Sequence, residues 1–240
     1  MRINVTVWNE VENNQEAYPE GIHTVIADFL GRDTNINTVR TAVQSQPEHG
    51  LTQEVLDDTD VLVWWAHHYH YDVSDEVVAR VQQRVLQGMG LVLLHSAHAA
   101  KIFQRLMGTN TERLRWRETG ELERLWTIEH NHPITEGLAA EYLEIPKSEM
   151  YGEYFDIPTP NELIFISWYA GGEVFRSGCT FKRGNGKIFY FSPGHESYRI
   201  YDMPEIQKII TNSVHWAAPV GYPNVAYNEH RESPEDLRLV

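Results

Sequence analysis

Short apolar runs alternate with helically spaced apolar residues along the first half of the chain. The runs Ile3–Trp8, Asp60–Trp65 and Leu91–Leu94 are too short for helices, and the last two have the near-continuous apolar character of parallel strands covered on both faces. The helically spaced residues between them are Ile22, Ile26, Phe29 and Leu30, then Val77, Val78, Val81, Val85 and Leu86. This alternation predicts a parallel sheet with right-handed crossovers and helices on both faces.

Residues with strong positional preferences mark the ends of these helices. Thr52 and Ser74 suit the N-cap, because their hydroxyl groups accept hydrogen bonds from free backbone N–H groups. Gly88 suits the position just past a helix end, where the backbone conformation favours glycine. Pro19 suits the first turn of the first helix. With a weaker strand over 37–43, the first half is predicted to alternate strand and helix four times.

The second half predicts hairpins rather than further strand–helix units. Its strand candidates are Arg124–Glu129, Leu163–Trp168, Val174–Phe181 and Lys187–Phe191. Gly171-Gly172 is a hairpin signal, and Gly184-Asn185-Gly186 predicts a tight turn. Met203–Ala217 follows as a final amphipathic helix. Since no repeat or linker divides the chain, we expect a single α/β domain over residues 1–218 and a C-terminal tail over 219–240.

Composition and charge exclude several classes of function. The chain has 240 residues and a formal net charge of −14, so it is long enough for one well-buried core and too acidic to favour a nucleic-acid or anionic-membrane partner. The one cysteine, Cys179, excludes an intrachain disulfide and sits in a strand pattern as a small buried residue. No apolar run approaches the roughly 20 residues that span a bilayer, and the first residues form a strand pattern rather than a signal peptide. We expect a cytoplasmic protein with no nucleotide cofactor.

Histidines gather directly after two of the predicted strands. They are His67, His68 and His70 after the second strong strand, and His95 and His98 after the third. Because open α/β sheets bind ligands beyond the carboxyl ends of their strands, we expect these side chains to converge. Neutral imidazole suits zinc and related divalent ions, and a catalytic site uses about three protein ligands plus an open position. The predicted metal ligands are His67, His98 and His195, with His70 and His95 contacting the substrate; the alternative is a polar surface turn without a function.

Two further groups carry ionisable side chains. His195, after the last predicted strand, suits a general base, and Glu196 would hold its ring and tautomer; the alternative is a turn or capping histidine. Glu149 and Glu153 flank Tyr151, and carboxylates beside aromatic rings are expected where sugars bind; the alternative is a solvated acidic loop. We expect Glu153 to face the histidines as ligand or base and Tyr151 to contact the substrate.

Ser96 occupies the strand-to-helix turn where α/β hydrolases and class I glutamine amidotransferases present their nucleophile. Its neighbours lack the Gly-x-Ser-x-Gly pattern, and His95 would be bulky in so strained a corner. Covalent catalysis by Ser96 is therefore an alternative rather than the main prediction.

Two other patterns predict structure rather than chemistry. Six tryptophans, most of them inside strand or helix patterns, are expected in the core: Trp64, Trp65, Trp116, Trp126, Trp168 and Trp216. Arginines and glutamates alternate over 112–123, which indicates a solvated surface of mixed charge.

The chain resembles the ThuA-like, or trehalose-utilisation, family, whose fold is that of the class I glutamine amidotransferases. The resemblance runs from the first strand to about Pro219. It is carried by Trp64–His67, Gly90–His98, His132–Ile134, Glu149–Glu153, Phe175–Gly178, Gly186–Phe191 and Pro193–Glu196. It implies a flavodoxin-like, doubly wound, mostly parallel sheet with hairpin additions, in which Ser96 replaces the amidotransferase cysteine and His195-Glu196 matches the end of its triad. It also implies the handling of trehalose or related disaccharides and their keto forms, alongside a sugar dehydrogenase.

Three hypotheses follow. The leading one is a sugar-metabolism enzyme with a His-rich site that holds a divalent metal, with zinc as the expected ion, and that promotes isomerisation, lyase or hydrolase chemistry on a disaccharide or its keto derivative. The second is a serine-dependent hydrolase or amidotransferase relative that uses Ser96, His195 and Glu196. The third is a non-catalytic sugar-binding partner of a dehydrogenase. The aromatic-rich second half and the tail also favour a homo-oligomer.

Overall fold

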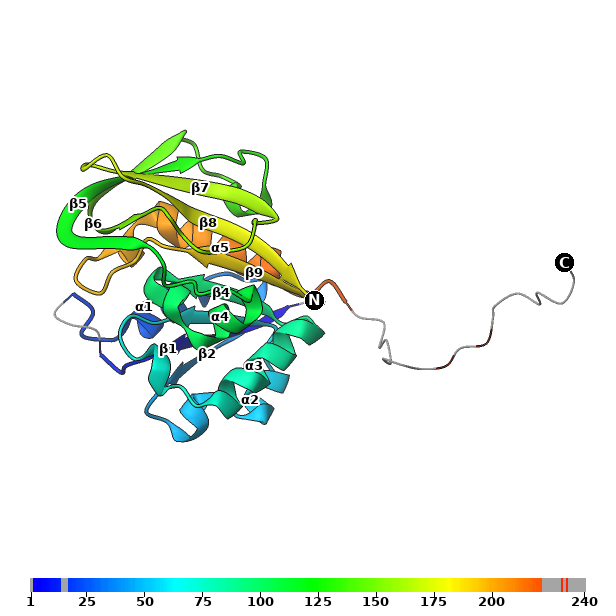
Figure 1. Cartoon of the computed structure of the whole chain (residues 1–240). Helices are drawn as coiled ribbons and strands as arrows, with labels where there is room; N and C mark the ends of the chain where they lie inside the picture. Colours follow the sequence, from blue (N-terminus) through cyan, green and yellow to red (C-terminus); the bar gives the residue numbers. More distant parts are fainter. Residues whose placement is uncertain (1, 14–16, 222–229, 231, 233–240) are drawn as a thin grey trace, which may run out of the picture.

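Five parallel strands form one half of a nine-stranded sheet. The computed structural model describes residues 2–13, 17–221, 230 and 232, and within them the strand order is β2-β1-β3-β4-β9-β8-β7-β5-β6 (Figure 1). The parallel strands are β1 (Ile3–Asn9), β2 (Ile36–Val43), β3 (Val61–Trp65), β4 (Gly90–Leu94) and β9 (Gly186–Phe191). Figure 1 shows them below the antiparallel strands.

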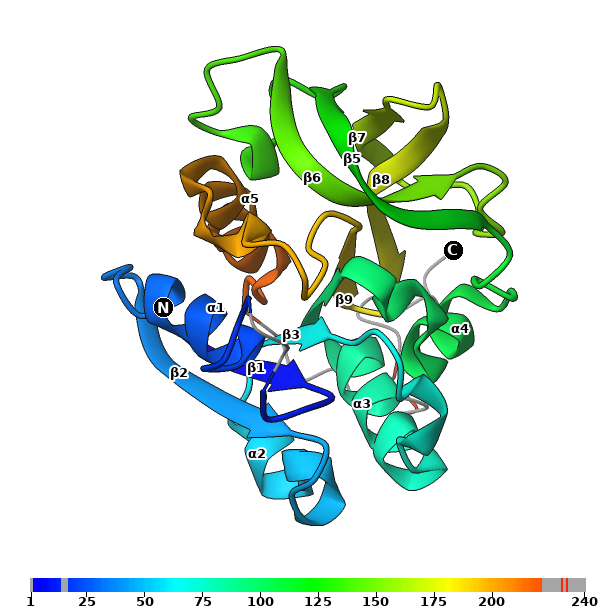
Figure 2. The ribbon, with the colours of Figure 1, turned by 90° about the vertical axis from the view of Figure 1, so that its left-hand side faces the viewer.

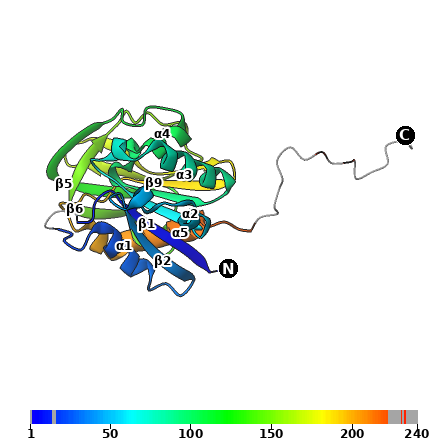
Figure 3. The ribbon, with the colours of Figure 1, turned by 90° about the horizontal axis from the view of Figure 1, so that it is seen from below.

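Helices cover both faces of the parallel strands (Figures 2 and 3). One face carries α2 (Gln53–Asp57), α3 (Asp75–Gln87) and α4 (Lys101–Met107), and the other carries α1 (Ile22–Leu30) and α5 (Pro204–Ala217). Successive strand residues point to opposite faces, so Leu91 and Leu93 join the first core whereas Val92 and Leu94 join the second. The continuous apolar runs of the sequence are thus explained, and the predicted α/β sheet with helices on both faces is confirmed.

Four antiparallel strands extend the sheet beyond β9. These are β8 (Val174–Arg183), β7 (Glu162–Tyr169), β5 (Arg115–Thr127) and β6 (Tyr142–Gly152). The predicted hairpin additions are present but larger than expected: the candidate Arg124–Glu129 is only the end of the long β5, and β6 was not predicted. Pro146 and Lys147 interrupt the apolar pattern of β6, and its position at the sheet edge is where a strand tolerates proline.

Three of the four predicted helix ends agree with the structure, whereas Pro19 precedes α1, which begins at Ile22 after Gly21. The hydroxyl of Thr52 accepts from the backbone N–H of Val55, and that of Ser74 accepts from Val77. Gly88 ends α3 with a φ of 127°. Leu86 was expected on the apolar face of α3 but is exposed, and the buried residues of this helix are all valines.

Two predictions about surface and core are wrong. Trp116 and Trp126 are exposed rather than buried. Trp126 lies between the buried Leu125 and Thr127 and so points to the other side of β5. Trp116 lies on a part of β5 that has no buried residue. Glu123, expected on a solvated surface, is fully buried on that same strand. Most of the predicted tail over 219–240 lies outside the described residues, and no helix among the described residues is both long enough and apolar enough to span a membrane.

Candidate active site

The candidate site lies where three parallel strands end together. Trp65, Leu94 and Phe191 are level with one another in the sheet, because β3 pairs Trp65 with Leu94 and β9 pairs Phe191 with Leu94. Residues that follow these strands therefore leave the sheet at one edge, in the place expected for ligands of α/β sheets. His67 and His95 come from the first two loops and His195 from the third.

His95 occupies the strained corner after β4. It is fully buried and has a φ of 57°, a left-handed conformation that is uncommon outside glycine and that gathers at functional sites. Its Nδ1 lies 3.3 Å from the carbonyl oxygen of Ser192. The sequence prediction put Ser96 at the nucleophile position and judged a histidine too bulky for the corner. In the structure His95 itself occupies the corner, and the carbonyl of Ser192, in the loop after β9, contacts its ring.

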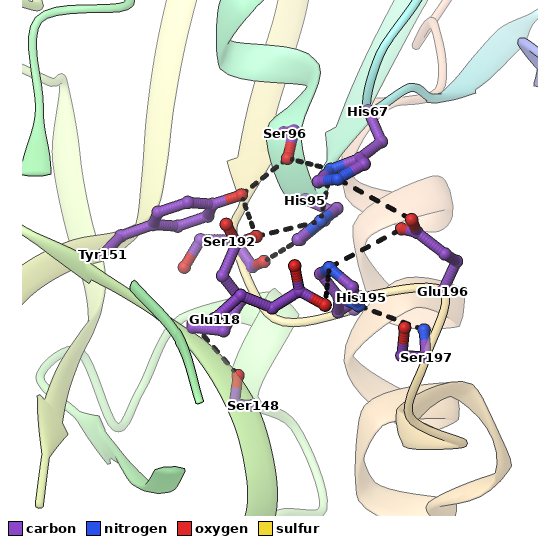
Figure 4. Close-up of polar contacts among 12 residues, drawn as sticks. His67, His95, Ser96, Glu118, Ser148, Tyr151, Ser192, His195, Glu196 and Ser197 are labelled. Carbon is purple, nitrogen blue, oxygen red and sulfur yellow. Dashed lines mark hydrogen bonds and ion pairs between the residues drawn. The ribbon is translucent and has the colours of Figure 1, made fainter. Parts of the chain in front are cut away.

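Four side chains converge on one point behind this corner (Figure 4). One ligand atom from each of His67, His95, His195 and Glu196 lies within 4.8 Å of the others. His67 Nδ1 is 3.1 Å from His95 Nε2, and His67 Nε2 is 3.6 Å from Glu196 Oε1. We refer to these four residues as the histidine cluster.

Burial keeps the imidazoles of the histidine cluster neutral. It lowers the pKa of His67 to about 2 and that of His95 well below its usual range, and the neighbouring histidines lower both further. The pKa of His195 is also lowered, again chiefly by burial, although Glu118 opposes the shift. Each ring therefore has one protonated and one unprotonated nitrogen.

Hydrogen bonds assign the proton in two of these rings. The carbonyl of Ser192 only accepts, so His95 carries its proton on Nδ1 and has a lone pair on Nε2. The backbone N–H of Ser197 donates to Nδ1 of His195 over 3.0 Å, so the His195 proton is on Nε2. That N–H points toward Glu118 Oε1, 3.4 Å away. His95 thus offers a lone pair to the cluster and His195 offers a proton.

Glu149 rather than Glu153 faces the histidine cluster. Glu149 Oε2 lies 3.4 Å from His95 Nε2, and burial raises the pKa of this carboxyl to about 7. Glu153 points elsewhere: it accepts from Nε of Arg176 over 2.8 Å and from the backbone N–H of Phe155. These bonds outweigh its partial burial and lower its pKa. The expected place of Glu153 as ligand or base is taken by Glu149, four residues earlier on β6.

His98 and His70 stand apart from the histidine cluster. Nδ1 of His98 lies 3.2 Å from the hydroxyl of Tyr190, and burial lowers its pKa to about 3. His70 is buried, with a pKa lowered by burial to about 4. Both line the adjacent pocket. The structure therefore brings two of the three predicted ligands together, His67 and His195, and places His98 in the pocket wall.

A pocket of about 440 Å³ opens in front of the cluster, which is within the usual size range of small-molecule sites. Its lining is His67, His68, His70, Ser96, His98, Ala99, Glu112, Leu114, Trp116, Glu118, Glu149 and Tyr151. Trp116 is 66% exposed at its wall. Three glutamates and no lysine or arginine line it among the described residues.

Sequence reasoning missed Trp116, Glu118 and Glu10. The first two alternate along β5, so both side chains lie on one side of that strand, a period-two signal hidden by the surrounding charges. Glu10 is buried at the end of β1, and its carboxylate accepts from the backbone N–H groups of His68 and Tyr69 over 2.7 and 2.9 Å. It fixes the loop that carries His67.

Comparison with known proteins identifies the relatives of this chain. The sequence matches the model of the ThuA family, described as trehalose utilisation, over residues 4–217. The chain belongs to the ThuA family. It therefore has the class I glutamine amidotransferase-like fold and a role related to sugar metabolism. The comparison with curated proteins gave no match.

Solved structures of other ThuA-like and amidotransferase-like proteins share this fold. A ThuA-like protein from Parabacteroides merdae has a TM-score of 0.71 at 16% identity, covering 93% of this chain and 94% of that chain. A cytoplasmic protein from Salmonella typhimurium has a TM-score of 0.59 at 12% identity, covering 90% and 99%. PurLQS from Thermotoga maritima has a TM-score of 0.56 at 12% identity, also covering 90% and 99%. At such low identities these likenesses show the fold alone.

Proposed function

We propose that this ThuA-family chain is an enzyme of carbohydrate metabolism that acts on a disaccharide or its keto derivative at a divalent metal site. The observation that carries the proposal is the convergence of three neutral imidazoles and one carboxylate within 4.8 Å, at the edge of the sheet where β3, β4 and β9 end. Nε2 of His195 and Oε2 of Glu196 are buried there without a hydrogen bond among the described residues. Buried polar atoms of this kind call for a partner.

The proton positions divide the histidine cluster into ligands and a proton carrier. His67, His95 and Glu196 provide two imidazoles and a carboxylate, a set found in catalytic zinc sites with a further position left open. His195 carries its proton on Nε2 and is the better proton donor. This assignment replaces the sequence-based set of His67, His98 and His195, and two histidines with a glutamate are a donor set of catalytic zinc sites.

A bound divalent ion would polarise a carbonyl or hydroxyl oxygen of the sugar. The residues of the chain would move the proton. Glu149, with a pKa of about 7 and a place in the pocket wall, suits a base that takes a proton from carbon beside a sugar carbonyl. His195, held beside Glu118, suits the acid that returns a proton to oxygen. Isomerase and lyase reactions both need this pair.

The pocket has the composition of a sugar site. Trp116 presents an exposed ring at the wall, and aromatic faces pack against the C–H faces of sugar rings. Glu112 and Glu118 provide acceptors for sugar hydroxyl groups. Membership in a trehalose-utilisation family supports the same class of substrate.

Metal content and proton transfer test the proposal separately. Elemental analysis of purified protein is expected to find about one zinc ion per chain, lost in His67→Ala and His95→Ala and kept in His98→Ala, the matched control outside the cluster. In D₂O with trehalose and its keto derivatives, NMR is expected to show exchange or product formation that Glu149→Gln abolishes. Metal that survives both cluster variants would contradict the metal site, and turnover unaffected by Glu149→Gln would contradict the base.

One observation favours a second candidate, a serine hydrolase. The hydroxyl of Ser96 lies 2.8 Å from Nδ1 of His67, a distance suited to a nucleophile and its base. The base would then be His67 and not the His195 that the sequence pattern named. A fluorophosphonate probe that labels the protein, but not the Ser96→Ala variant, would support this candidate over the metal enzyme.

We also propose a cytoplasmic location, in keeping with the neighbour from Salmonella typhimurium that is named a cytoplasmic protein. A keto sugar arises by oxidation of a sugar hydroxyl, so a sugar dehydrogenase is the proposed supplier of substrate. A chain that binds sugar tightly without turnover, even with such a dehydrogenase present, would instead be a binding partner of that enzyme. Self-association is proposed from the aromatic-rich second half, and light scattering measures it.

A further inference from the structure

A line of hydrogen bonds joins the pocket wall to the histidine cluster (Figure 4). The hydroxyl of Tyr151 donates to Glu149 Oε2 over 2.8 Å. The oxygens of Tyr151 and Ser96 are 2.6 Å apart, and Ser96 Oγ is 2.8 Å from His67 Nδ1. Tyr151 and Ser96 are both buried, so little water competes for these bonds. We call Ser96, Tyr151 and Glu149 the hydroxyl line.

The line has one consistent direction. The hydroxyl of Tyr151 donates its only proton to Glu149, so toward Ser96 it can only accept a hydrogen bond. The hydroxyl of Ser96 therefore donates its only proton to Tyr151, and toward His67 it can only accept a hydrogen bond. The ring nitrogen that faces Ser96 must therefore carry the proton. His67 is left with its lone pair on Nε2, the atom that lies 3.6 Å from Glu196.

Without this line, two other arrangements of the His67 proton would each occupy a lone pair that a metal ion needs, and the first is donation from Nδ1 to His95 Nε2. In the second, a proton on Nε2 would face the carboxylate of Glu196, and hydrogen bonds to ionised acceptors are the stronger ones. Ser96 is also closer to His67 Nδ1 than His95 Nε2 is, at 2.8 Å against 3.1 Å. By taking this proton, Ser96 leaves the lone pair of His95 unoccupied as well.

We propose that Ser96 and Tyr151 are positioning residues that hold His67 with its proton on Nδ1, so that Nε2 can bind a metal ion. The inference rests on the proposed metal site and explains Ser96 without a covalent step. In known metal sites, the groups that orient ligating histidines change metal affinity by about 10- to 100-fold. Ser96 would supply that orientation here, with Tyr151 and Glu149 fixing its direction.

Two variants break the line at different points, and each is expected to occupy a lone pair that the metal ion needs. Ser96→Ala removes the nearer acceptor for the Nδ1 proton of His67, which then points to the lone pair of His95 Nε2. Tyr151→Phe removes the acceptor of Ser96, whose hydroxyl can then turn and donate to Nδ1, so that the His67 proton moves to Nε2. Matched controls are Ser177→Ala and Tyr169→Phe, since Ser177 and Tyr169 are buried and lie outside the line.

Zinc affinity, measured by competition with a chromophoric chelator, is expected to fall about 10- to 100-fold in both variants and to stay unchanged in the controls. The visible absorption of the cobalt-loaded protein is expected to change in the same two variants. Circular dichroism confirms folding, and Tyr151→Phe, which removes a single oxygen, keeps the test valid if Ser96→Ala misfolds. Unchanged affinity and an unchanged cobalt spectrum in folded variants would overturn the inference.

The ¹⁵N chemical shifts of His67 in the metal-free protein separate this inference from the proposed function. They are expected to show the Nδ1–H tautomer in the parent chain and in Ser96→Ala, and the Nε2–H tautomer in Tyr151→Phe. If the His67 tautomers are as expected but the parent chain binds no zinc, the metal site is contradicted and the positioning by Ser96 and Tyr151 is not. If the parent chain binds zinc but the His67 tautomer is the same in the parent chain and in Tyr151→Phe, the positioning alone is contradicted.

Discussion

At the residue scale, the chemistry of this site follows from where protons lie on a few buried rings. His95 and His195 come from neighbouring loops and are both neutral, yet a carbonyl holds one and a backbone N–H holds the other in the opposite tautomer. One ring is thereby suited to bind a cation and the other to donate a proton. Residue types alone do not show this difference, because it depends on the backbone groups of Ser192 and Ser197.

Trp116 gives a test of the sugar site. Trp116→Ala is expected to weaken disaccharide binding about tenfold, since an aromatic contact contributes roughly 0.5–1.5 kcal/mol beyond the area it covers. Titration calorimetry measures this. Trp126→Ala, a change on the same strand outside the pocket lining, is the control and should leave affinity unchanged. Equal losses in both variants would place the effect in the strand rather than in the pocket.

At the element scale, the loop after β9 is shaped by one glycine. Gly194 has a φ of 139°, and a Cβ there would collide with the hydroxyl of Tyr201. Its carbonyl also accepts from Nε1 of Trp65 over 3.1 Å. The next residue is His195, so the position of this ring depends on a backbone conformation that only glycine adopts without strain.

Gly194→Ala is therefore expected to reduce turnover and to destabilise the fold by more than about 1 kcal/mol. Gly172→Ala is the control, because Gly172 also has a positive φ of 93° but has open space around it. Urea denaturation and a turnover assay measure both effects. If the two variants lose equal stability and turnover, the collision with Tyr201 does not matter.

Glu123 on β5 predicts a pH dependence of stability. It is fully buried, and burial raises its pKa above the ordinary value of 4.5. The folded chain keeps this proton at pH values where the unfolded chain has lost it, so the stability it contributes is present below about pH 4.5 and is lost as the pH rises through the folded pKa. Glu123→Gln removes this loss.

The Glu123→Gln variant is thus expected to be more stable than the parent by about 1 kcal/mol at pH 8 and to lose that advantage near pH 4. Thermal unfolding across this range measures it. Glu129→Gln, a change at an exposed glutamate just after β5, should leave the curve unchanged. A Glu123→Gln advantage that grows toward low pH would contradict the assignment.

The elements of the first half were predictable because local signals agree with the fold. Ser74 caps α3 and Gly88 ends it, and the continuous apolar run at Leu91–Leu94 is buried on both faces. The first part of β5 and the whole of β6 were not predictable, since charged residues at adjacent positions mask the alternation of β5 and Pro146 interrupts β6. Both strands are stabilised by pairing with distant partners, which a local pattern does not reveal.

At the scale of the whole molecule, the site is assembled by topology. The sequence indicated that His67 and His195 would meet, because both follow parallel strands. It could not indicate that His98 lies outside the histidine cluster or that Glu149 replaces Glu153. Which way these side chains point depends on the turn after β4 and on the backbone between Glu149 and Glu153. Such details depend on the strained turn at His95 and on the ion pair between Glu153 and Arg176.

The pocket is acidic, as is the chain as a whole. The net charge is −14, and the pocket has three glutamates and no basic residue in its described lining. A phosphorylated disaccharide is therefore expected to bind at least about tenfold more weakly than the uncharged sugar, since like charges repel in a partly buried site. Calorimetry with trehalose and its 6-phosphate measures this, and tighter binding of the phosphate would contradict it.

The central claim is that the histidine cluster holds a metal ion, and anomalous diffraction at the zinc edge tests it most directly. Crystals grown with zinc are expected to give one strong peak bonded to His67, His95 and Glu196 at about 2.0–2.2 Å, with His195 turned toward Glu118. Absence of a peak at these residues, or a peak held by His98 instead, would contradict the account.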